Sequence, residues 1–205
     1  MAKIKLTKGE LKRQRDALKQ YERYLPTLQL KKQQLQLEIL HQLSLLDEKN
    51  RILDKKMEQA KSWAGLLAEE AVDIKSLLDV HEIKSKSLNI AGVDIPIFID
   101  VSFAPADYDL FSAPLWLDLG IENLRGILVL RLEVDIIAEG ISILRHELKV
   151  TAQRVNLFEK VKIPETEENI RLIKIYIGDQ MANAVGRSKI AKRKIEESVL
   201  EESLA

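Results

Sequence analysis

The sequence predicts an all-α fold: a long antiparallel two-helix coiled-coil hairpin with a small β-hairpin-like knob between the helices. Three observations support it. The 205 residues include only 8 Gly and 5 Pro, about half their usual share. Ala, Glu, Lys, Leu and Arg fill 100 positions, a share typical of coiled coils. Apolar residues also recur at heptad spacing in two long stretches. An all-β or a doubly wound fold is therefore disfavoured.

Residues 1–87 form the first predicted helical segment. Every seventh residue from Leu11 carries an apolar side chain with one exception, Lys32. We expect one amphipathic helix from about residue 6 to 82, kinked where Pro26 removes a backbone donor. Lys32 has two interpretations, a lysine that snorkels out of a loose part of the coil or a charge that sets the register or faces a partner. The apolar members are Leu11, Leu18, Leu25, Ile39, Leu46, Leu53, Ala60, Leu67 and Ile74.

Residues 115–205 form the second predicted helical segment, and they carry the most regular heptads of the chain. Nine of ten successive seam positions are apolar, so this stripe must be buried against another helix. Pro164 interrupts the pattern, and Ile170, Ile173 and Ile177 then resume it. The seam positions are Ile127, Leu130, Val134, Ile137, Ile141, Leu144, Leu148, Thr151, Val155 and Phe158.

Residues 88–114 form the predicted knob between the helices. This segment contains three of the five prolines and no Lys or Arg. The alternation of Ile97, Ile99, Val101 and Phe103 predicts a short strand with these side chains on one face. A turn at Gly92 precedes the strand, and a proline inside it confines it to a sheet edge.

The distribution of charge predicts a cationic end of the coil. If the helices fold back on each other, the two termini meet at one tip. Residues 1–34 hold ten basic and three acidic side chains, and residues 185–195 hold five basic and no acidic ones. Such a tip favours an acidic partner, although basic helix ends are often merely solvated. The candidate partner-binding residues are Lys3, Lys5, Lys8, Lys12, Arg13, Arg15, Lys189, Lys192, Arg193 and Lys194.

Catalytic and cofactor chemistry is not expected from this sequence. It has no cysteine and three isolated histidines, and its paired glutamates are adjacent on helices, where neighbours point to different faces. We predict no catalytic residue, no cofactor and no metal site, hence not an enzyme. Lys+Arg and Asp+Glu balance at 32 each, so no overall charge favours nucleic acid. Neither a secretory signal nor a membrane span is predicted.

Three motifs carry a resemblance to a known family. The sequence Arg154-Val-Asn-Leu-Phe-Glu-Lys-Val-Lys-Ile-Pro164 closely resembles the second long helix of the D-subunit family of V-type (A/V-type) ATPases and ATP synthases. The first helix agrees at Arg23, Leu28, Lys31, Lys32 and Leu35, and the knob agrees at residues 90–96. The sequence Tyr24-Leu-Pro-Thr-Leu-Gln is similar to the bacterial branch of that family.

This resemblance implies a non-catalytic central-stalk rotor subunit, which couples ATP hydrolysis or synthesis in a catalytic hexamer to ion translocation by rotation. The implied partners are the catalytic and non-catalytic subunits of the hexamer, the small F subunit of the central stalk and the subunit connecting the stalk to the membrane ring. The implied location is cytoplasmic, peripheral to the inner (plasma) membrane as part of the complex. The alternative is a coiled-coil adaptor or scaffold that docks on an acidic partner or an anionic membrane surface.

Overall fold

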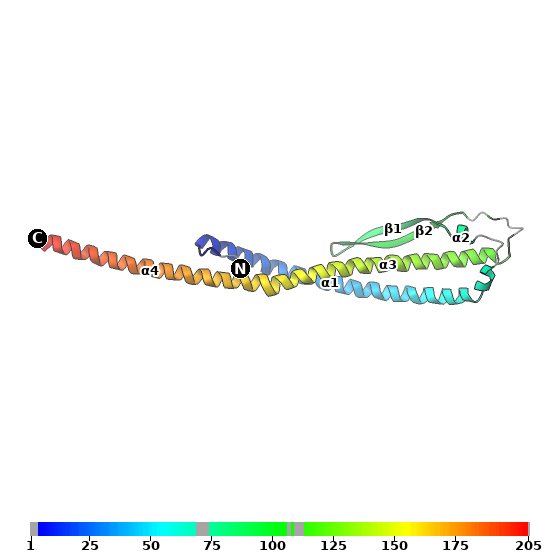
Figure 1. The fold of residues 1–205 in the computed structure, drawn as a ribbon, viewed down its shortest axis with the longest axis horizontal. Helices are drawn as coiled ribbons and strands as arrows, with labels where there is room; N and C mark the ends of the chain where they lie inside the picture. Colours follow the sequence, from blue (N-terminus) through cyan, green and yellow to red (C-terminus); the bar gives the residue numbers. More distant parts are fainter. Residues whose placement is uncertain (1–3, 69–73, 106–107, 109–112, 205) are drawn as a thin grey trace. The chain divides into compact units, whose positions relative to one another are not determined.

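A computed structural model describes residues 4–68, 74–105, 108 and 113–204. Along the chain it has helix α1 (Lys8–Lys61), the 3-10 helix η1 (Ala64–Ala68), the short helix α2 (Ile74–Leu77), strands β1 (Val80–Ile90) and β2 (Val93–Phe103), helix α3 (Leu117–Leu157), the π-helix η2 (Phe158–Lys162) and helix α4 (Ile163–Leu204) (Figure 1). The predicted fold class, long helices with a small two-stranded sheet, is confirmed. The chain divides into two units, residues 30–152 and residues 1–29 with 153–205.

The prediction that the first helix continues to residue 82 is wrong. Helix α1 ends at Lys61, and β1 occupies Val80–Ile90, where helix had been expected to continue. Gly65 follows the end of α1 and weakens a helix, whereas the eleven residues of β1 pair with β2 along their length, with two irregularities. The apolar residues that recur every seventh position after Lys61 therefore do not form a helix, because pairing with β2 decides the structure of the residues in β1. Residues 69–73, within the span expected to be helical, lie outside the described residues.

In the unit of residues 30–152, α1 and α3 lie side by side and antiparallel (Figure 1). Lys31 Nζ pairs with Glu147 at 2.8 Å, and Lys49 Nζ, farther along α1, pairs at 2.7 Å with Glu133, which is earlier in α3. Leu35 and Leu144 are fully buried between the helices. All ten predicted seam positions from Ile127 to Phe158 are buried or half-buried, so the seam prediction is confirmed. Lys32 is half-buried, and both interpretations of it stay predictions.

Strands β1 and β2 form an antiparallel hairpin with a two-residue turn at Ala91-Gly92. Both turn residues have positive φ, 52° and 75°, as a type I′ turn requires. The side chain of Asn89 supports the turn, because its Oδ1 accepts from the Gly92 N–H at 3.2 Å. Val93 and Ile95 pack on Leu35, Ile39 and Leu144, so the turn end of the hairpin rests on the two long helices.

The predicted strand is present as part of β2, but its alternating apolar side chains are not equally buried. Val101 is buried, whereas Ile97 and Ile99 are exposed. The pairing explains the difference: Lys84 faces Asp100 and Ser85 faces Phe98, which leaves Ile99 as an extra residue. Such a bulge shifts the side-chain alternation by one residue.

Arg125 of α3 holds the base of the hairpin. Its guanidinium donates to the carbonyl oxygen of Leu77 and to that of Ala104, both at 2.7 Å, and it lies 5.0 Å from the ring centre of Phe103. The residues before β1 and after β2 are thus bound by one side chain. Leu77, Leu117 and Ile121 form a small core beside it.

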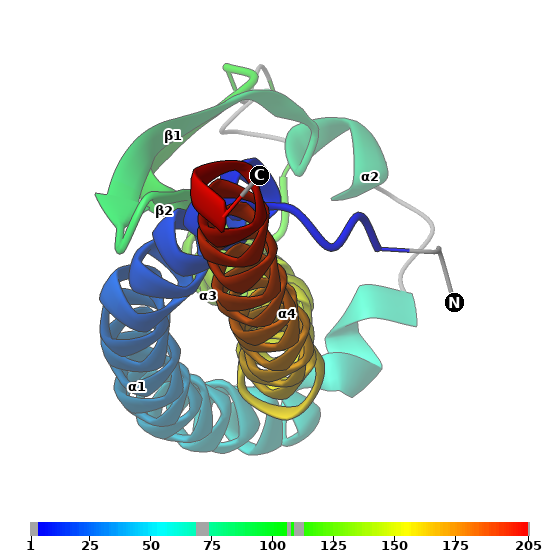
Figure 2. The same cartoon turned by 90° about the vertical axis from the view of Figure 1, so that its left-hand side faces the viewer.

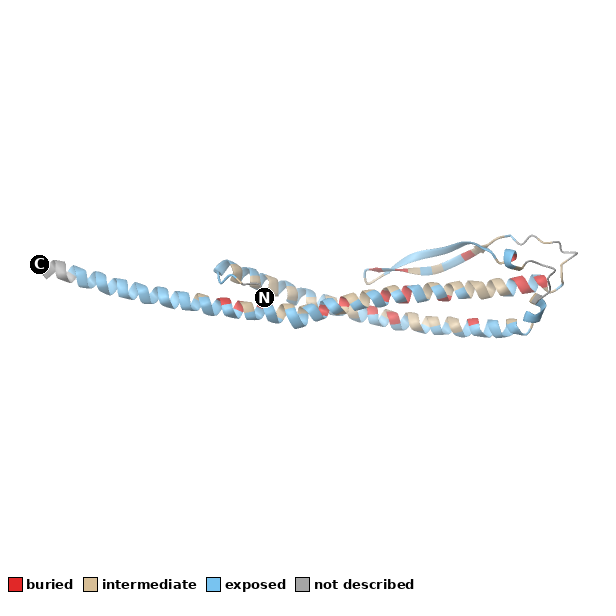
Figure 3. Cartoon of the chain, viewed as in Figure 1, coloured by how far each residue is buried: buried red, intermediate tan, exposed pale blue. Residues whose placement is uncertain are grey.

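In the unit of residues 1–29 and 153–205, the start of α1 packs along the start of α4. Tyr21 stacks on Phe158 with ring centres 5.4 Å apart, and Leu18 shares a groove with Ile170 and Ile175. Helix α1 continues through Pro26. Buried residues lie along the shared seam, whereas residues 178–199 of α4 are exposed (Figure 3).

Candidate functional site

The N-terminal group of predicted partner-binding residues lies on the exposed surface of the first turns. Lys3 is outside the described residues, and Lys5, Lys8, Lys12, Arg13 and Arg15 are all exposed. Three of them, Lys8, Lys12 and Arg15, are spaced by four and three residues, which places them on one face of α1. Lys19 extends this row and is also exposed. Sequence reasoning omitted Lys19, although its spacing from Arg15 is the signal that could have found it.

The C-terminal group lies on a part of α4 that no other described helix covers. Every described side chain from 178 to 199 is exposed, and this range includes Lys189, Lys192, Arg193 and Lys194. Viewed from the C-terminal end, α4 projects toward the reader as a single helix (Figure 2). Twenty-two residues at about 1.5 Å each make this segment about 30 Å long. We call residues 178–199 the free segment of α4.

The prediction that the two termini meet at one tip, with the two basic stretches side by side, is wrong. Helix α1 begins at Lys8, so only 8–29 of it belong to this unit, whereas α4 runs from Ile163 to Leu204. The longer helix necessarily extends past the shorter one. Figure 1 shows the end of α4 well beyond the start of α1. The two basic groups therefore follow each other along the unit.

The free segment has an uncovered apolar stripe. The seam positions Thr166, Ile170 and Ile173 are buried against α1, and the same spacing of three and four residues continues after them. Met181 and Ile195 on this continuation are 51% and 63% exposed. A coiled-coil seam without its second helix favours a partner that supplies apolar contacts. The uncovered seam positions are Met181, Ala184, Ser188, Ala191 and Ile195.

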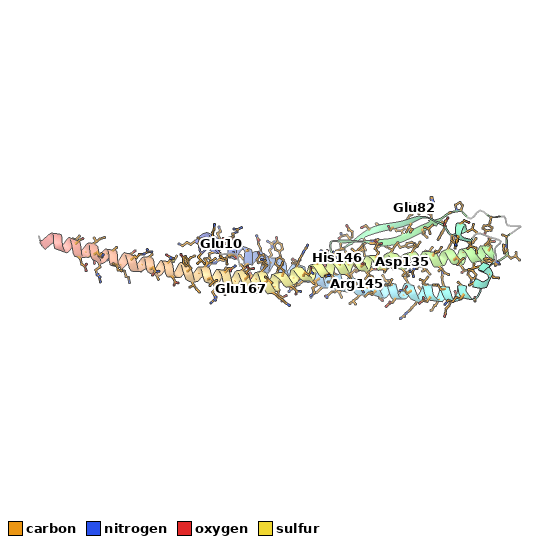
Figure 4. All side chains as sticks on the ribbon, in the orientation of Figure 1. Glu10, Glu82, Asp135, Arg145, His146 and Glu167 are labelled. Carbon is orange, nitrogen blue, oxygen red and sulfur yellow. The ribbon has the colours of Figure 1, made fainter. Side chains whose placement is uncertain are left out.

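Basic side chains flank this stripe on both sides. At 100° per residue, Lys192 lies beside the stripe, Lys189 and Arg193 lie farther round on the same side, and Arg187 and Lys194 lie on the other side. Figure 4 shows side chains along both edges of α4. Among the described residues, Lys189 and Lys194 make no ion pair with an acidic side chain. The segment combines an apolar strip with positive borders.

Two ion pairs reduce the local charge only weakly. Lys192 lies 3.6 Å from Glu196, and Arg193 lies 3.6 Å from Glu197. All four side chains are at least 60% exposed, and exposed pairs of this kind contribute little stability and are screened by salt. Their cations stay available to an acidic partner, which can replace the intrahelical carboxylates.

A stronger charged pair borders the groove near Leu18. Arg171 donates to both carboxylate oxygens of Glu168, at 2.7 and 2.8 Å. Hydrogen bonding to Arg171 lowers the pKa of Glu168, and the same bond raises the pKa of Arg171. The bidentate geometry fixes both side chains on one face of α4. This pair organises a surface and offers no group for proton transfer near neutral pH.

The described residues contain no group of three or more His, Cys, Asp or Glu side chains placed to hold a metal ion. His41 has one close carboxylate, that of Glu38 at 3.5 Å. Within the described ranges, no helix combines the length and apolar character needed to cross a bilayer. The absence of a cofactor and of catalysis stays a prediction from the sequence.

Comparison with known proteins assigns the family. Residues 10–193 match the family model of the ATP synthase D subunit. A V-type ATP synthase D subunit from Borreliella burgdorferi is 47% identical over 192 residues, which cover 94% of this chain and 95% of that protein. Proteins of the same name from Chlamydia pneumoniae and Chlamydia caviae are 33% and 32% identical, with coverage of 94% and 96% of this chain and of 93% and 95% of theirs. The chain, with its long helices, hairpin and uncovered basic segment, therefore belongs to the ATP synthase D-subunit family.

Proposed function

We propose that this chain is the central-stalk rotor subunit of a V-type rotary ATPase or ATP synthase. It couples ATP hydrolysis or synthesis in the catalytic hexamer to ion translocation by rotation. Membership of the D-subunit family supports the assignment to the complex. The observation that carries the mechanical role is the free segment of α4, which offers an apolar stripe and positive borders for insertion into a surrounding ring.

The geometry of a coil suits a rotating shaft. A pair of unlike helices has no threefold symmetry, so turning it inside a pseudo-threefold ring presents a different face to each catalytic interface in turn. Long helices transmit torque because their backbone hydrogen bonds are internal. The inter-helix pairs of Lys31 with Glu147 and Lys49 with Glu133 resist sliding of α1 along α3.

The partners follow from this role. The free segment and the row of Lys8, Lys12 and Arg15 contact the catalytic and non-catalytic subunits of the hexamer. The small F subunit and the subunit connecting the stalk to the membrane ring bind elsewhere on the chain. In this assignment the chain itself is non-catalytic and lies in the cytoplasm, peripheral to the membrane as part of the complex.

Purification of the tagged chain from the cells that make it tests the assignment. We expect stoichiometric recovery of a hexameric ATPase together with small stalk subunits. An adaptor docked on an anionic membrane surface would instead recover no hexamer, and the pure chain would bind anionic vesicles in a salt-sensitive way. Recovery of the chain without ATPase subunits, with such vesicle binding, would overturn the proposal.

A further inference from the structure

The seam of α3 does not continue in phase into α4. From the end of α3 into η2, the buried or half-buried positions Leu144, Leu148, Thr151, Val155 and Phe158 are spaced by three and four residues. The same repeat would next bury residues 162, 165, 169, 172 and 176. Lys162 and Asn169 are half-buried, but the fully buried positions are Thr166, Ile170 and Ile173, each one position after 165, 169 and 172. Leu172 and Tyr176, which the unshifted repeat would bury, are 46% and 41% exposed.

One extra residue accounts for this shift, and the structure shows where it is absorbed. Between α3 and α4 the backbone forms the π-helix η2, in which the N–H of Ile163 donates to the carbonyl oxygen of Phe158, five residues earlier. A π-turn contains one more residue than an α-turn, and the helix axis keeps its direction through it. Each residue after the turn therefore takes the place around the axis that the preceding residue would have in an uninterrupted α-helix. The apolar stripe therefore stays on the side that faces α1.

Helix α1 has no matching insertion. Half-buried positions spaced by three and four residues continue through this part of α1: Leu11, Gln14, Leu18, Tyr21, Leu25 and Leu28, with Glu10 and Ala17 half-buried beside them. The extra residue is therefore on one helix only. The stack of Tyr21 on Phe158 joins the two helices at the level where the π-turn begins.

Each helix also loses a backbone hydrogen bond on one side of this stack, five residues after Tyr21 in α1 and six residues after Phe158 in α4. Pro26 lies inside α1 and Pro164 is the second residue of α4, and a proline has no N–H to donate. Thr166 is 5% exposed, and its hydroxyl donates to the carbonyl oxygen of Lys162 at 2.6 Å. The Thr166 hydroxyl thus supplies a side-chain donor to the carbonyl oxygen of the last residue of η2. A π-turn also has poorer hydrogen-bond geometry than an α-turn.

We propose that η2 and the two prolines form a compliant joint in the coil, where the helices twist more readily than on either side. The inserted residue loosens one helix, Pro26 loosens the other, and the aromatic stack keeps them together. The role of the joint rests on the proposed function: in a shaft driven in steps, it takes up twist between the catalytic ring and the rest of the stalk. The joint itself is a property of the isolated chain.

Hydrogen exchange on the intact chain tests the joint without any partner. We expect the amides of residues 160–166 to exchange at least about tenfold faster than those of residues 150–157 and 170–176, since the loss of two hydrogen bonds lowers local opening energies by that order. Deleting the exposed Glu159 removes the extra residue, so the π-turn becomes an α-turn and this difference disappears. Glu159→Ala keeps the length and leaves the fast exchange unchanged. Pro26→Ala slows exchange in α1 alone.

Two results would overturn the joint. One is equal protection of residues 160–166 and their neighbours in the unaltered chain. The other is a lower melting temperature after deletion of Glu159, because a seam already in phase would be rotated away from α1 by the deletion. In a reconstituted rotary complex, the deletion should narrow the angular fluctuation of a bead attached to the shaft. A chain that shows the exchange pattern but fails to join the complex would refute the proposed function and leave the joint standing.

Discussion

Single buried side chains decide how firmly the coil is held. Leu144 of α3 is 0% exposed and contacts residues from α1 and from the hairpin. Leu37, which lies on α1 between two of the contacted residues, is 68% exposed. Replacing Leu144 with Ala should lower the free energy of unfolding by about 2–5 kcal/mol, because a cavity is left where three elements meet. Urea unfolding followed by circular dichroism measures this change.

Leu37→Ala is the matched control for Leu144→Ala. It removes the same atoms from an exposed position, so we expect a change within about 0.5 kcal/mol. Equal effects of the two substitutions would contradict the assignment of the core to the seam.

The pair of Glu168 with Arg171 predicts a small pH dependence. The pKa of Glu168 is lowered in the folded chain, so the folded state binds fewer protons at this group than the unfolded state. Its stabilising contribution is present above the ordinary pKa of a glutamate and is lost as the pH falls through the lowered value. Melting temperatures of the chain and of Glu168→Gln should differ at about pH 7 and converge once the pH has fallen below the lowered pKa of Glu168. A difference in melting temperature that stays constant across this pH range would show that the negative charge of Glu168 does not stabilise the fold.

Among the elements, the hairpin turn offers the clearest substitution test. Ala91 has a φ of 52°, which is unfavourable for an alanine, and Asn is favoured at this position of a type I′ turn. Ala91→Asn should stabilise the chain by about 0.5–1 kcal/mol, measured by chemical unfolding. Gly92→Ala should destabilise it by about 1 kcal/mol, although an added Cβ would meet only the distant Lys31 Nζ at 4.0 Å. A stabilising Gly92→Ala would contradict the turn type.

Some elements could be predicted from the sequence and others could not, for identifiable physical reasons. The seam from Ile127 to Phe158 is regular enough that only one helix face can be buried. The end of α1 was missed because Leu67 and Ile74 keep the seven-residue spacing after the helix has ended. The bulge at Ile99 depends on pairing with β1, which local alternation does not reveal.

The candidate site could be predicted only in part, because its charges are local in the sequence but its geometry depends on how the helices pair. Charge runs are visible in the sequence, and all nine described candidates are exposed. How far α4 extends past α1 depends on where each helix begins and on which residues pair. Ile170, Ile173 and Ile177 resume a helical spacing after Pro164, but the one-residue shift became visible only once burial was known.

At the scale of the whole molecule, the chain combines an internally paired coil with a segment that lacks a partner of its own. The seam buried in α3 and early α4 stabilises the chain, and its continuation along residues 178–199 is exposed and bordered by basic side chains. This division is what a rotor subunit needs, since the part held by the ring must be accessible while the rest transmits torque. In our proposal, the role in a V-type rotary complex depends on the free segment.

Charge reversal in the free segment tests this central claim most directly. The variant carries Lys189→Glu, Lys192→Glu, Arg193→Glu and Lys194→Glu, and its control reverses four exposed cations of the other unit, Lys55, Lys84, Lys86 and Lys149. The measurement is ATP-driven rotation and coupled ion transport in the complex reconstituted with each chain. The account predicts that the free-segment variant assembles poorly or hydrolyses ATP without coupled transport, and that the control retains coupling. Full coupled activity with the free-segment variant would contradict it.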